Sequence, residues 1–250
     1  MIGAPLLINR FARAMATYER EAVVQRQAAE RLAELLGEHC HRLAPRILEI
    51  GCGTGVLSRL LMRRFAPSEL VLNDLCPDMA ICFANVPRTR FLPGDARTLA
   101  WPGTFDLVAS ASAVQWFGDL GAFAERCAAC LTPGGLLAVS GFGPETLRET
   151  AALTGRALDY PTPAHFEATL AARFTPLACE HACHTLRFPD AYAVLRHLKA
   201  TGVTATGQDR APWTRGRLEA FAAAYAERFP APEGGVTLTY ETCLFLGCRA

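Results

Sequence analysis

A glycine-rich turn that joins a short apolar run to a helix-like segment is the strongest constraint this sequence places on its fold. The run Arg46–Ile50 has the apolar character of a buried strand, and Val56–Phe65 has the spacing of a helix. Between them lie Gly51, Gly53 and Gly55, which allow the backbone to turn sharply and to approach a ligand closely. This arrangement predicts a ligand site at the carboxyl end of a parallel strand.

The spacing of the three glycines indicates what kind of ligand to expect. Dinucleotide-binding proteins use G-x-G-x-x-G, in which the last glycine comes three residues after the second. Here the pattern is G-x-G-x-G, and residue 56 is a valine. This departure disfavours a pyrophosphate ligand, so a nucleotide-dependent reductase is kept only as an alternative.

Apolar strands alternate with helical segments through the first part of the chain, as in a parallel sheet covered on both faces. The expected strands are 46–50, 70–74, 89–92, 105–110 and 136–141, and the expected helices are 56–65, 77–85 and 120–131. Beyond residue 144 the pattern becomes mostly helical, with a strand expected at 177–188. A last strand at 236–247 alternates in polarity, which is typical of an antiparallel strand.

The chain of 250 residues is expected to form a single domain around one core. Three regions are distinguished within it: an N-terminal helical cap over residues 9–37, a ligand-binding core over 46–142, and a helical lid over 189–232 before the last strand.

Two aspartates follow neighbouring strands of the predicted sheet. Asp74 ends the second strand, where a carboxylate can accept hydrogen bonds from both hydroxyls of a ribose. Asp95 follows Gly94 after the third strand, within reach of an adenine amino group. Each aspartate alone has a structural alternative, as a helix cap or a turn residue. Together, at successive strand ends, they favour a nucleoside ligand.

This combination of glycines and acids resembles the class I S-adenosylmethionine-dependent methyltransferases. The resemblance implies a Rossmann-like α/β fold with a seven-stranded mixed sheet, helices on both faces and an antiparallel last strand. It also implies S-adenosylmethionine as cofactor, with its methionine part held by Glu49 and the glycines, its ribose by Asp74 and its adenine by Asp95. The full set of cofactor residues is Glu49, Gly51, Cys52, Gly53, Gly55, Asp74, Leu75, Gly94, Asp95, Ala96 and Ser110.

Residues outside the glycine turn narrow the resemblance to one family. The segments that carry it are Phe11–Arg13, Tyr18, Gln25–Gln27, Ser112–Trp116, Leu198–Lys199 and the last strand. Over residues 11–247 the chain is similar to the malonyl-acyl-carrier-protein O-methyltransferases, with Asn73 and Val203 as departures. This implies methyl transfer to the free carboxylate of a malonyl thioester on acyl carrier protein or coenzyme A, giving the methyl ester that begins pimeloyl and biotin synthesis. A carboxylate is ionised near neutral pH, so no strong general base is required.

Six residues are candidates for positioning the acceptor: Arg13, Tyr18, Gln115, Trp116, Lys199 and Tyr240. We expect Tyr18 to donate a hydrogen bond while closing over cofactor and acceptor, and Gln115 and Trp116 to form one wall. Packed core rings are the alternative for Tyr18 and Tyr240.

A basic residue should orient the malonyl carboxylate, and Arg13, Arg148 and Lys199 remain open for this role. Lys199 is the only lysine in the chain, although a solvated helix end is its alternative. An acidic carrier protein also requires a basic docking face, where charges mainly steer the encounter. The candidates for that face are His197, Lys199, Arg210, Arg215 and Arg217. Arginines scattered over the surface are the alternative.

Composition excludes several other classes of protein. The net charge of +1 disfavours a nucleic-acid partner, and no run of 18 apolar residues suggests a membrane span. The short apolar start lacks a secretory leader, so we expect a cytoplasmic protein with reduced, buried cysteines. The cysteines at 127 and 130 and those at 179 and 183 lack knuckle-like settings, so no metal is expected. The remaining alternatives are a methyltransferase for a free acid such as trans-aconitate or for a quinone precursor, and a non-catalytic S-adenosylmethionine-binding protein.

Overall fold

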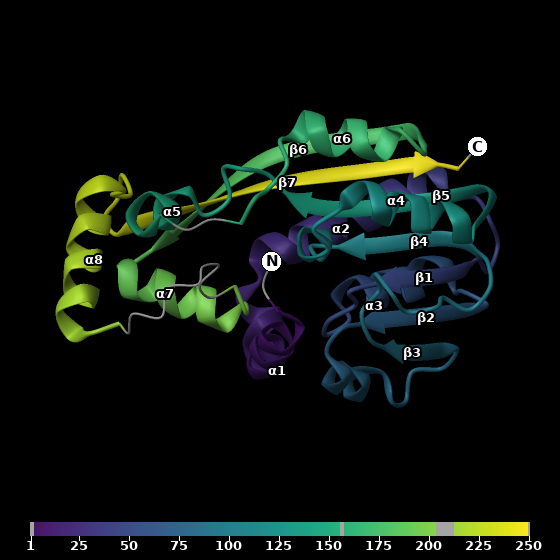
Figure 1. Ribbon diagram of the computed structural model, residues 1–250, viewed down its shortest axis with the longest axis horizontal. Helices are drawn as coiled ribbons and strands as arrows, with labels where there is room; N and C mark the ends of the chain where they lie inside the picture. The colour runs from purple at the N-terminus through teal and green to yellow at the C-terminus, as the bar shows by residue number, and fades with distance from the viewer. Residues whose placement is uncertain (1–2, 156–157, 204–212, 250) are drawn as a thin grey trace.

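The computed structural model of the chain describes residues 3–155, 158–203 and 213–249. One mixed sheet runs through them, with seven strands in the order β3-β2-β1-β4-β5-β7-β6 (Figure 1). The strands are β1 Arg46–Ile50, β2 Glu69–Asp74, β3 Thr89–Pro93, β4 Phe105–Ala111, β5 Leu131–Phe142, β6 Thr175–Phe188 and β7 Val236–Cys248. β1 to β5 pair in parallel, whereas β7 is antiparallel to both β5 and β6. The predicted seven-stranded mixed sheet with an antiparallel last strand is confirmed.

Helices cover both faces of the sheet. The helices are α1 Ala4–Glu21, α2 Val23–His39, α3 Val56–Phe65, α4 Leu120–Cys130, α5 Arg148–Thr154, α6 Pro163–Ala171, α7 Ala191–Ala200 and α8 Arg215–Arg228, with 3₁₀ helices η1 Pro77–Phe83 and η2 Val114–Trp116. In β1, Ile47 points into the core beneath α2 and α3, and Leu48 points into the core beneath α4 and α6. Both side chains are fully buried, which explains why the parallel strands are continuous apolar runs.

The single helix expected within the cap at residues 9–37 is instead two helices that meet at Ala22. Neither glycine nor proline marks this break, so local sequence does not reveal it. Tertiary packing accounts for it, because α2 packs on the sheet and α3 while α1 lies beside α7. There the Thr17 hydroxyl donates a hydrogen bond to the Ala200 carbonyl at 2.9 Å. The break at Ala22 allows α1 to leave α2 and to lie opposite the carboxyl ends of the strands.

The last two strands extend beyond the parallel sheet and form an antiparallel arm (Figure 1). β7 pairs with β5 as far as Thr242, but its pairing with β6 continues to Val236. Side chains of α7 and α8, such as Val194 and Tyr225, form a separate core against the arm. These two helices lie within the segment 189–232 expected as a lid, while residues 204–212, Arg210 included, lie outside the described residues.

Three other expectations concerned the cysteines, metal sites and membrane-spanning helices. All ten cysteines are free, and only some are buried, because Cys82, Cys179 and Cys183 are exposed. Within the described ranges, no group of His, Cys, Asp and Glu side chains is arranged to hold a metal ion. Over the same ranges, no helix combines the length and the apolar character needed to cross a bilayer.

Candidate functional site

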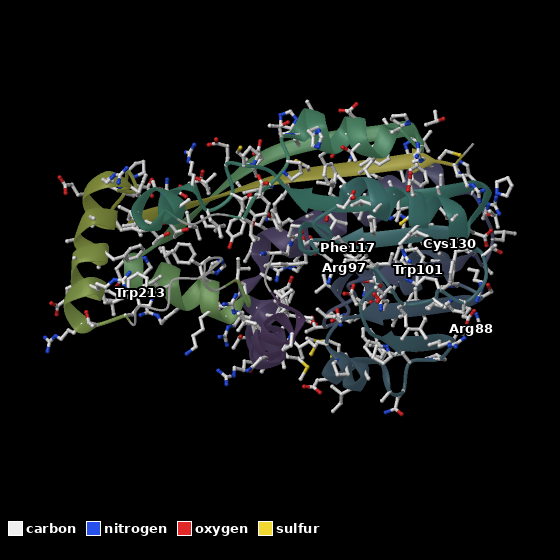
Figure 2. The ribbon with its side chains drawn as sticks, viewed as in Figure 1. Arg88, Arg97, Trp101, Phe117, Cys130 and Trp213 are labelled. Atoms are coloured by element: carbon white, nitrogen blue, oxygen red, sulfur yellow. The ribbon has the colours of Figure 1, made fainter. Side chains whose placement is uncertain are left out.

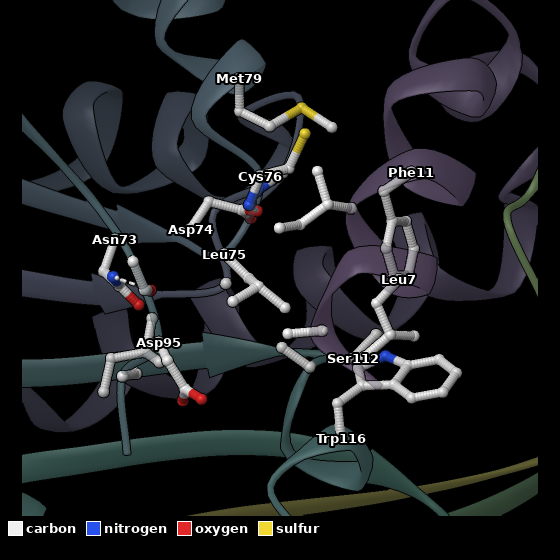
Figure 3. Close-up of a pocket in the computed structure, with 18 of the residues that line it drawn as sticks. Leu7, Phe11, Asn73, Asp74, Leu75, Cys76, Met79, Asp95, Ser112 and Trp116 are labelled. Carbon is white, nitrogen blue, oxygen red and sulfur yellow. Dashed lines mark hydrogen bonds between the residues drawn. The ribbon is translucent and has the colours of Figure 1, made fainter. Parts of the chain in front are cut away.

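A cavity of about 1000 Å³, including its open mouth, lies between α1 and the carboxyl ends of β1 to β4. We call it the strand-end cavity. In Figure 3, Leu7 and Phe11 on α1 face Asp74 and Leu75 across it. The cavity lies where the strand order reverses between β1 and β4, which is where open α/β sheets bind their ligands.

The glycines of the turn differ in what they contribute. Gly51 and Gly53 line the strand-end cavity and have positive φ angles of 71° and 51°. A side chain at Gly51 would collide with Ala113, whereas at Gly53 nothing lies within 4 Å of an added Cβ. Backbone at Gly53 is therefore open to a ligand.

Gly55 precedes α3 with a φ of 92°, and an added Cβ would lie 2.8 Å from the ring of Phe83. It does not line the strand-end cavity. Backbone conformation and packing therefore both favour glycine at this position.

Asp74 closes the turn from the neighbouring strand. Its two carboxylate oxygens accept hydrogen bonds from the backbone N–H groups of Gly53 and Cys76, each at 2.8 Å. Burial raises the pKa of Asp74 above its usual value. Asn73, noted above as a departure, has a structural role, because its amide donates to the carbonyls of Leu92 and Gly94 and joins the ends of β2 and β3.

Asp95 lines the other end of the cavity and is paired with a cation. Arg97 contacts the Asp95 carboxylate at 2.6 Å, and this hydrogen-bonded pair holds the Asp95 pKa below its usual value. The cavity is also lined by Leu75, Gly94 and Ala96, as the sequence predicted. This end of the cavity thus combines an acidic group with apolar lining.

Glu49 lies behind the glycine turn, in a smaller space that we call the loop cavity. Its residues include Tyr18, Gln25 and Cys52. Glu49 is 1% exposed, and its Oε2 atom has no hydrogen-bond partner among the described residues. Burial, assisted by the nearby charge of Asp74, raises the pKa of Glu49 to about 8. A buried, unpartnered carboxyl oxygen marks a place for a ligand donor.

A third space, the arm cavity, lies between α1, α2, η2 and the arm. Its lining includes Tyr18, Gln25, Ser112, Gln115, Trp116 and Tyr240. The buried atoms Gln25 Oε1, Ser112 Oγ and Gln115 Oε1 have no hydrogen-bond partner within the described part of the chain. Because buried polar atoms are normally paired, these atoms indicate a polar ligand.

Tyr18 and Ser112 line all three cavities and therefore join them. Burial, with a smaller effect from Asp74, raises the pKa of Tyr18 to about 12, so its hydroxyl stays protonated near neutral pH. Ser112 has a φ of 55°, and its N–H donates to the Ser140 carbonyl at 3.0 Å. A strained non-glycine residue held by the sheet is typical of functional sites.

Gln115 and Trp116, which η2 carries, line one side of the arm cavity. The side-chain amide of Gln115 donates to the Ser112 carbonyl at 2.7 Å, and the Trp116 ring meets Phe11 edge-on at 5.9 Å. Tyr240 enters from the arm, is 1% exposed, and has its hydroxyl 3.0 Å from Nε2 of His197.

Several predicted residues line none of the three cavities. Ser110 is buried, and its hydroxyl donates a hydrogen bond to the Ile50 carbonyl at 2.9 Å, so its side chain links β4 to β1. Arg13 and Lys199 are exposed on α1 and α7 and line none of the three cavities. His197, expected on a basic docking face, is only 4% exposed and belongs to the interior. For the three basic residues, the rotation of α1 and α7 about their axes decides whether the side chain faces a cavity, the interior or solvent. The type of residue alone does not reveal this rotation.

The structure also brings to the site residues that were not among the candidates for positioning the acceptor. Gln25 and Ser112 lie in segments that carry the family resemblance, and Gln25 is in addition a polar residue in the apolar stripe of α2. Thr201 carried no comparable signal. His197 shares the buried face of α7 with Val194 and Leu198, a spacing that indicates burial instead of surface docking.

Comparisons with known proteins agree with this geometry. A methyltransferase-domain model matches residues 48–139, which run from β1 into β5. The fold is similar to a crystal structure from Bacillus halodurans C-125, with a TM-score of 0.64 at 14% identity over 88% of this chain and 98% of that one. It is also similar to the N-methyltransferase NodS from Bradyrhizobium japonicum WM9, with a TM-score of 0.52 at 14% identity over 88% of this chain and 94% of that one.

Curated relatives match along nearly their whole length. The malonyl-acyl-carrier-protein O-methyltransferase of Porphyromonas gingivalis is 40% identical over 98% of this chain and 96% of its own length. That of Bacteroides thetaiotaomicron is 39% identical over 94% of each. S-adenosylmethionine is accordingly the methyl donor. The chain belongs to the malonyl-acyl-carrier-protein O-methyltransferase family, within the class I S-adenosylmethionine-dependent methyltransferases.

Proposed function

We propose that this enzyme transfers a methyl group to the free carboxylate of a malonyl group carried by acyl carrier protein, forming a methyl ester. The observation that carries the proposal is the meeting of the strand-end cavity and the arm cavity at Tyr18 and Ser112. One cavity suits a nucleoside, and the other presents unpartnered polar atoms to an acceptor. The names of the relatives support the choice of malonyl-carrier protein.

The residues of the strand-end and loop cavities fit S-adenosylmethionine. Glu49 has an unpartnered oxygen for the ammonium group, and Asp74 has lone pairs for the ribose hydroxyls. Asp95 would accept from the adenine amino group, with Leu75 and Ala96 against the base. When bound, the cofactor supplies an electrophilic methyl group on a positively charged sulfur.

The chain itself needs to position and shield the acceptor rather than activate it. The acceptor carboxylate is already ionised, so catalysis rests on alignment and on exclusion of water. The protonated hydroxyl of Tyr18 and the unpartnered hydroxyl of Ser112 are neutral donors that orient a carboxylate without removing its nucleophilicity. In this proposal α1 caps the cavities, and α7 and α8 form a lid on the arm side.

Radiolabelled methyl transfer tests the proposed function. Wild-type enzyme is incubated with labelled S-adenosylmethionine and malonyl-carrier protein, malonyl-coenzyme A, free malonate, trans-aconitate or a quinone precursor. We expect label on the malonyl thioesters, released as methanol by mild base because the product is an ester. Base-stable label, or transfer only to a free acid or a quinone precursor, contradicts the proposal.

Charge on α8 provides the docking prediction. The Arg215 side chain is 93% exposed, and Arg217 lies over the ring of Trp213, which Figure 2 labels beside α8. Changing both arginines to glutamate should raise the Michaelis constant for malonyl-carrier protein several-fold and leave that for malonyl-coenzyme A unchanged, because malonyl-coenzyme A lacks the acidic protein surface that would dock on α8. Equal changes in the Michaelis constants for both substrates would contradict the proposed docking surface on α8. Arg210, also expected there, lies outside the described residues.

The buried Glu49 predicts that cofactor affinity depends on pH. Its pKa of about 8 means that the free enzyme holds it protonated near pH 6.5. An ammonium group favours the ionised form, so binding releases a proton, and affinity should rise as pH rises. We expect the dissociation constant of S-adenosylhomocysteine to fall about tenfold from pH 6 to 7, measured by calorimetry.

Two variants control this pH experiment. Glu49→Gln should bind more weakly and lose the pH dependence. Glu69→Gln removes a carboxylate at the opposite end of the neighbouring strand, where it pairs with Arg46 at 2.7 Å, and should retain the wild-type profile. A wild-type affinity that stays constant over this range contradicts the assigned role of Glu49.

We also place the enzyme in the cytoplasm. The support is that all ten cysteines are free thiols, which suits a reducing compartment.

A further inference from the structure

The arm cavity poses an electrostatic problem if it takes the malonyl carboxylate as proposed above. Its described lining contains tyrosines, glutamines, a serine and threonines, but no cationic side chain. Arg13 and Lys199 are exposed elsewhere, and Arg148 is paired with Glu145 at 2.7 Å. The sulfonium of the bound cofactor is one countercharge, but methyl transfer consumes it, and the described lining adds no other for a carboxylate moved out of water. Among the described residues, His197 is a group behind the lining that can become positive.

His197 connects the cavity wall to α1. Its Nε2 atom lies 3.0 Å from the hydroxyl of Tyr240, which lines the cavity. Its Nδ1 atom lies 4.0 Å from the carboxylate of Glu21, which Arg20 contacts at 2.9 Å. From β6, the ring of Phe188 packs 5.0 Å away and contributes no charge.

The position of His197 on its own helix also matters for a positive charge. It lies in the last turn of α7, where the helix dipole stabilises a cation. The positive charge of Lys199 in the same turn disfavours a second positive charge on His197. Burial lowers the His197 pKa, and Glu21 offsets this only in part. The imidazole of the free enzyme is therefore neutral near pH 7.

In the neutral state the direction of the hydrogen bond follows from the imidazole tautomer. Glu21 favours the proton on Nδ1, so Nε2 accepts from the Tyr240 hydroxyl, and that hydroxyl proton points away from the acceptor. A second proton on the imidazole reverses the bond. Nε2 then donates to the Tyr240 oxygen, and the Tyr240 hydroxyl becomes free to donate into the cavity.

We propose that His197 is a positioning residue that takes up a proton from solvent when the acceptor carboxylate binds and, through Tyr240, turns a hydrogen-bond donor toward it. The inference rests on the proposed function of this cavity. The positive charge stays one residue away from the nucleophile, so the carboxylate is held without being neutralised. Methylation converts the anion to a neutral ester, after which His197 returns its proton to solvent and the grip on the product weakens.

The test is the pH dependence of the Michaelis constant for malonyl-carrier protein. In the wild-type enzyme it should rise with pH above the pKa of His197 in the free enzyme, approaching tenfold per pH unit for one proton. His197→Gln keeps a side-chain amide near Tyr240 but cannot be protonated. Its Michaelis constant should be about tenfold higher at pH 6.5 and independent of pH, with cofactor affinity unchanged. Tyr240→Phe should show the same loss of pH dependence.

His184 provides a matched control. Its Nε2 atom also contacts a β7 hydroxyl, that of Thr242 at 2.9 Å, but it lines none of the three cavities. His184→Gln should keep the wild-type profile, because His184 does not line the arm cavity. Any pH effect of the carrier protein itself is common to both enzymes and cancels in the comparison. Parallel profiles for wild type and His197→Gln overturn this inference while leaving the proposed function intact. A wild-type enzyme that methylates no malonyl thioester overturns the proposed function instead.

Discussion

Replacing Asp74 with alanine should weaken S-adenosylhomocysteine binding by about 10- to 100-fold, or about 1–3 kcal/mol, because charge-assisted hydrogen bonds to the ribose are lost. The carboxylate also accepts the backbone N–H groups of Gly53 and Cys76, so its removal loosens the turn as well. Calorimetric titration measures the loss. Asp78→Ala removes an exposed charge four residues further along and should leave the affinity unchanged.

A second substitution separates the two contributions of Asp74. Asp74→Asn keeps one oxygen acceptor for a backbone N–H but loses the charge. If ribose contacts dominate, the asparagine enzyme should bind nearly as weakly as the alanine enzyme but with a smaller drop in melting temperature, because one of the two backbone N–H groups keeps its acceptor. If both variants bind within twofold of wild type, Asp74 caps the turn and does not hold the ribose.

The central parallel strands β1, β2 and β4 could be predicted because they are buried on both faces. Runs such as Arg46–Ile50 and Phe105–Ala111 carry that burial as continuous apolar sequence, and Gly51 fixes where the first strand ends. The break at Ala22 could not be predicted in this way. It arises from contacts of α1 with α7, which lies about 180 residues further along the chain, as the bond between Thr17 and Ala200 shows.

The same division holds for the site. Glu49, Gly53 and Asp74 belong to one strand–turn–helix unit and its neighbour, so their spacing in the sequence is already their arrangement in space. The arm cavity is assembled from α1, α2, η2, α7 and β7. Basic residues were expected there because the acceptor is an anion, but α1 and α7 turn Arg13 and Lys199 outward. Only the packing of the helices decides that.

Tyr18 carries the other large effect that we expect. It lines all three cavities, and its pKa of about 12 keeps its hydroxyl a donor throughout the neutral range. Tyr18→Phe keeps the ring and removes the donor. The turnover number should fall about 10- to 100-fold, which is the cost of one hydrogen bond to a charged group. The dissociation constant of S-adenosylhomocysteine should change little.

Single-turnover methyl transfer at saturating cofactor isolates this effect from binding. Tyr192→Phe removes a hydroxyl from α7 that lines none of the cavities, and it should retain wild-type turnover. Because the pKa of Tyr18 lies so high, its ionisation should cause no loss of rate below about pH 10 in the wild-type enzyme. Unchanged turnover in Tyr18→Phe would mean that Tyr18 acts only as a packed ring between the cavities. A parallel loss of cofactor affinity would instead make it a wall of the cofactor site, with the acceptor oriented by other donors such as the Ser112 hydroxyl.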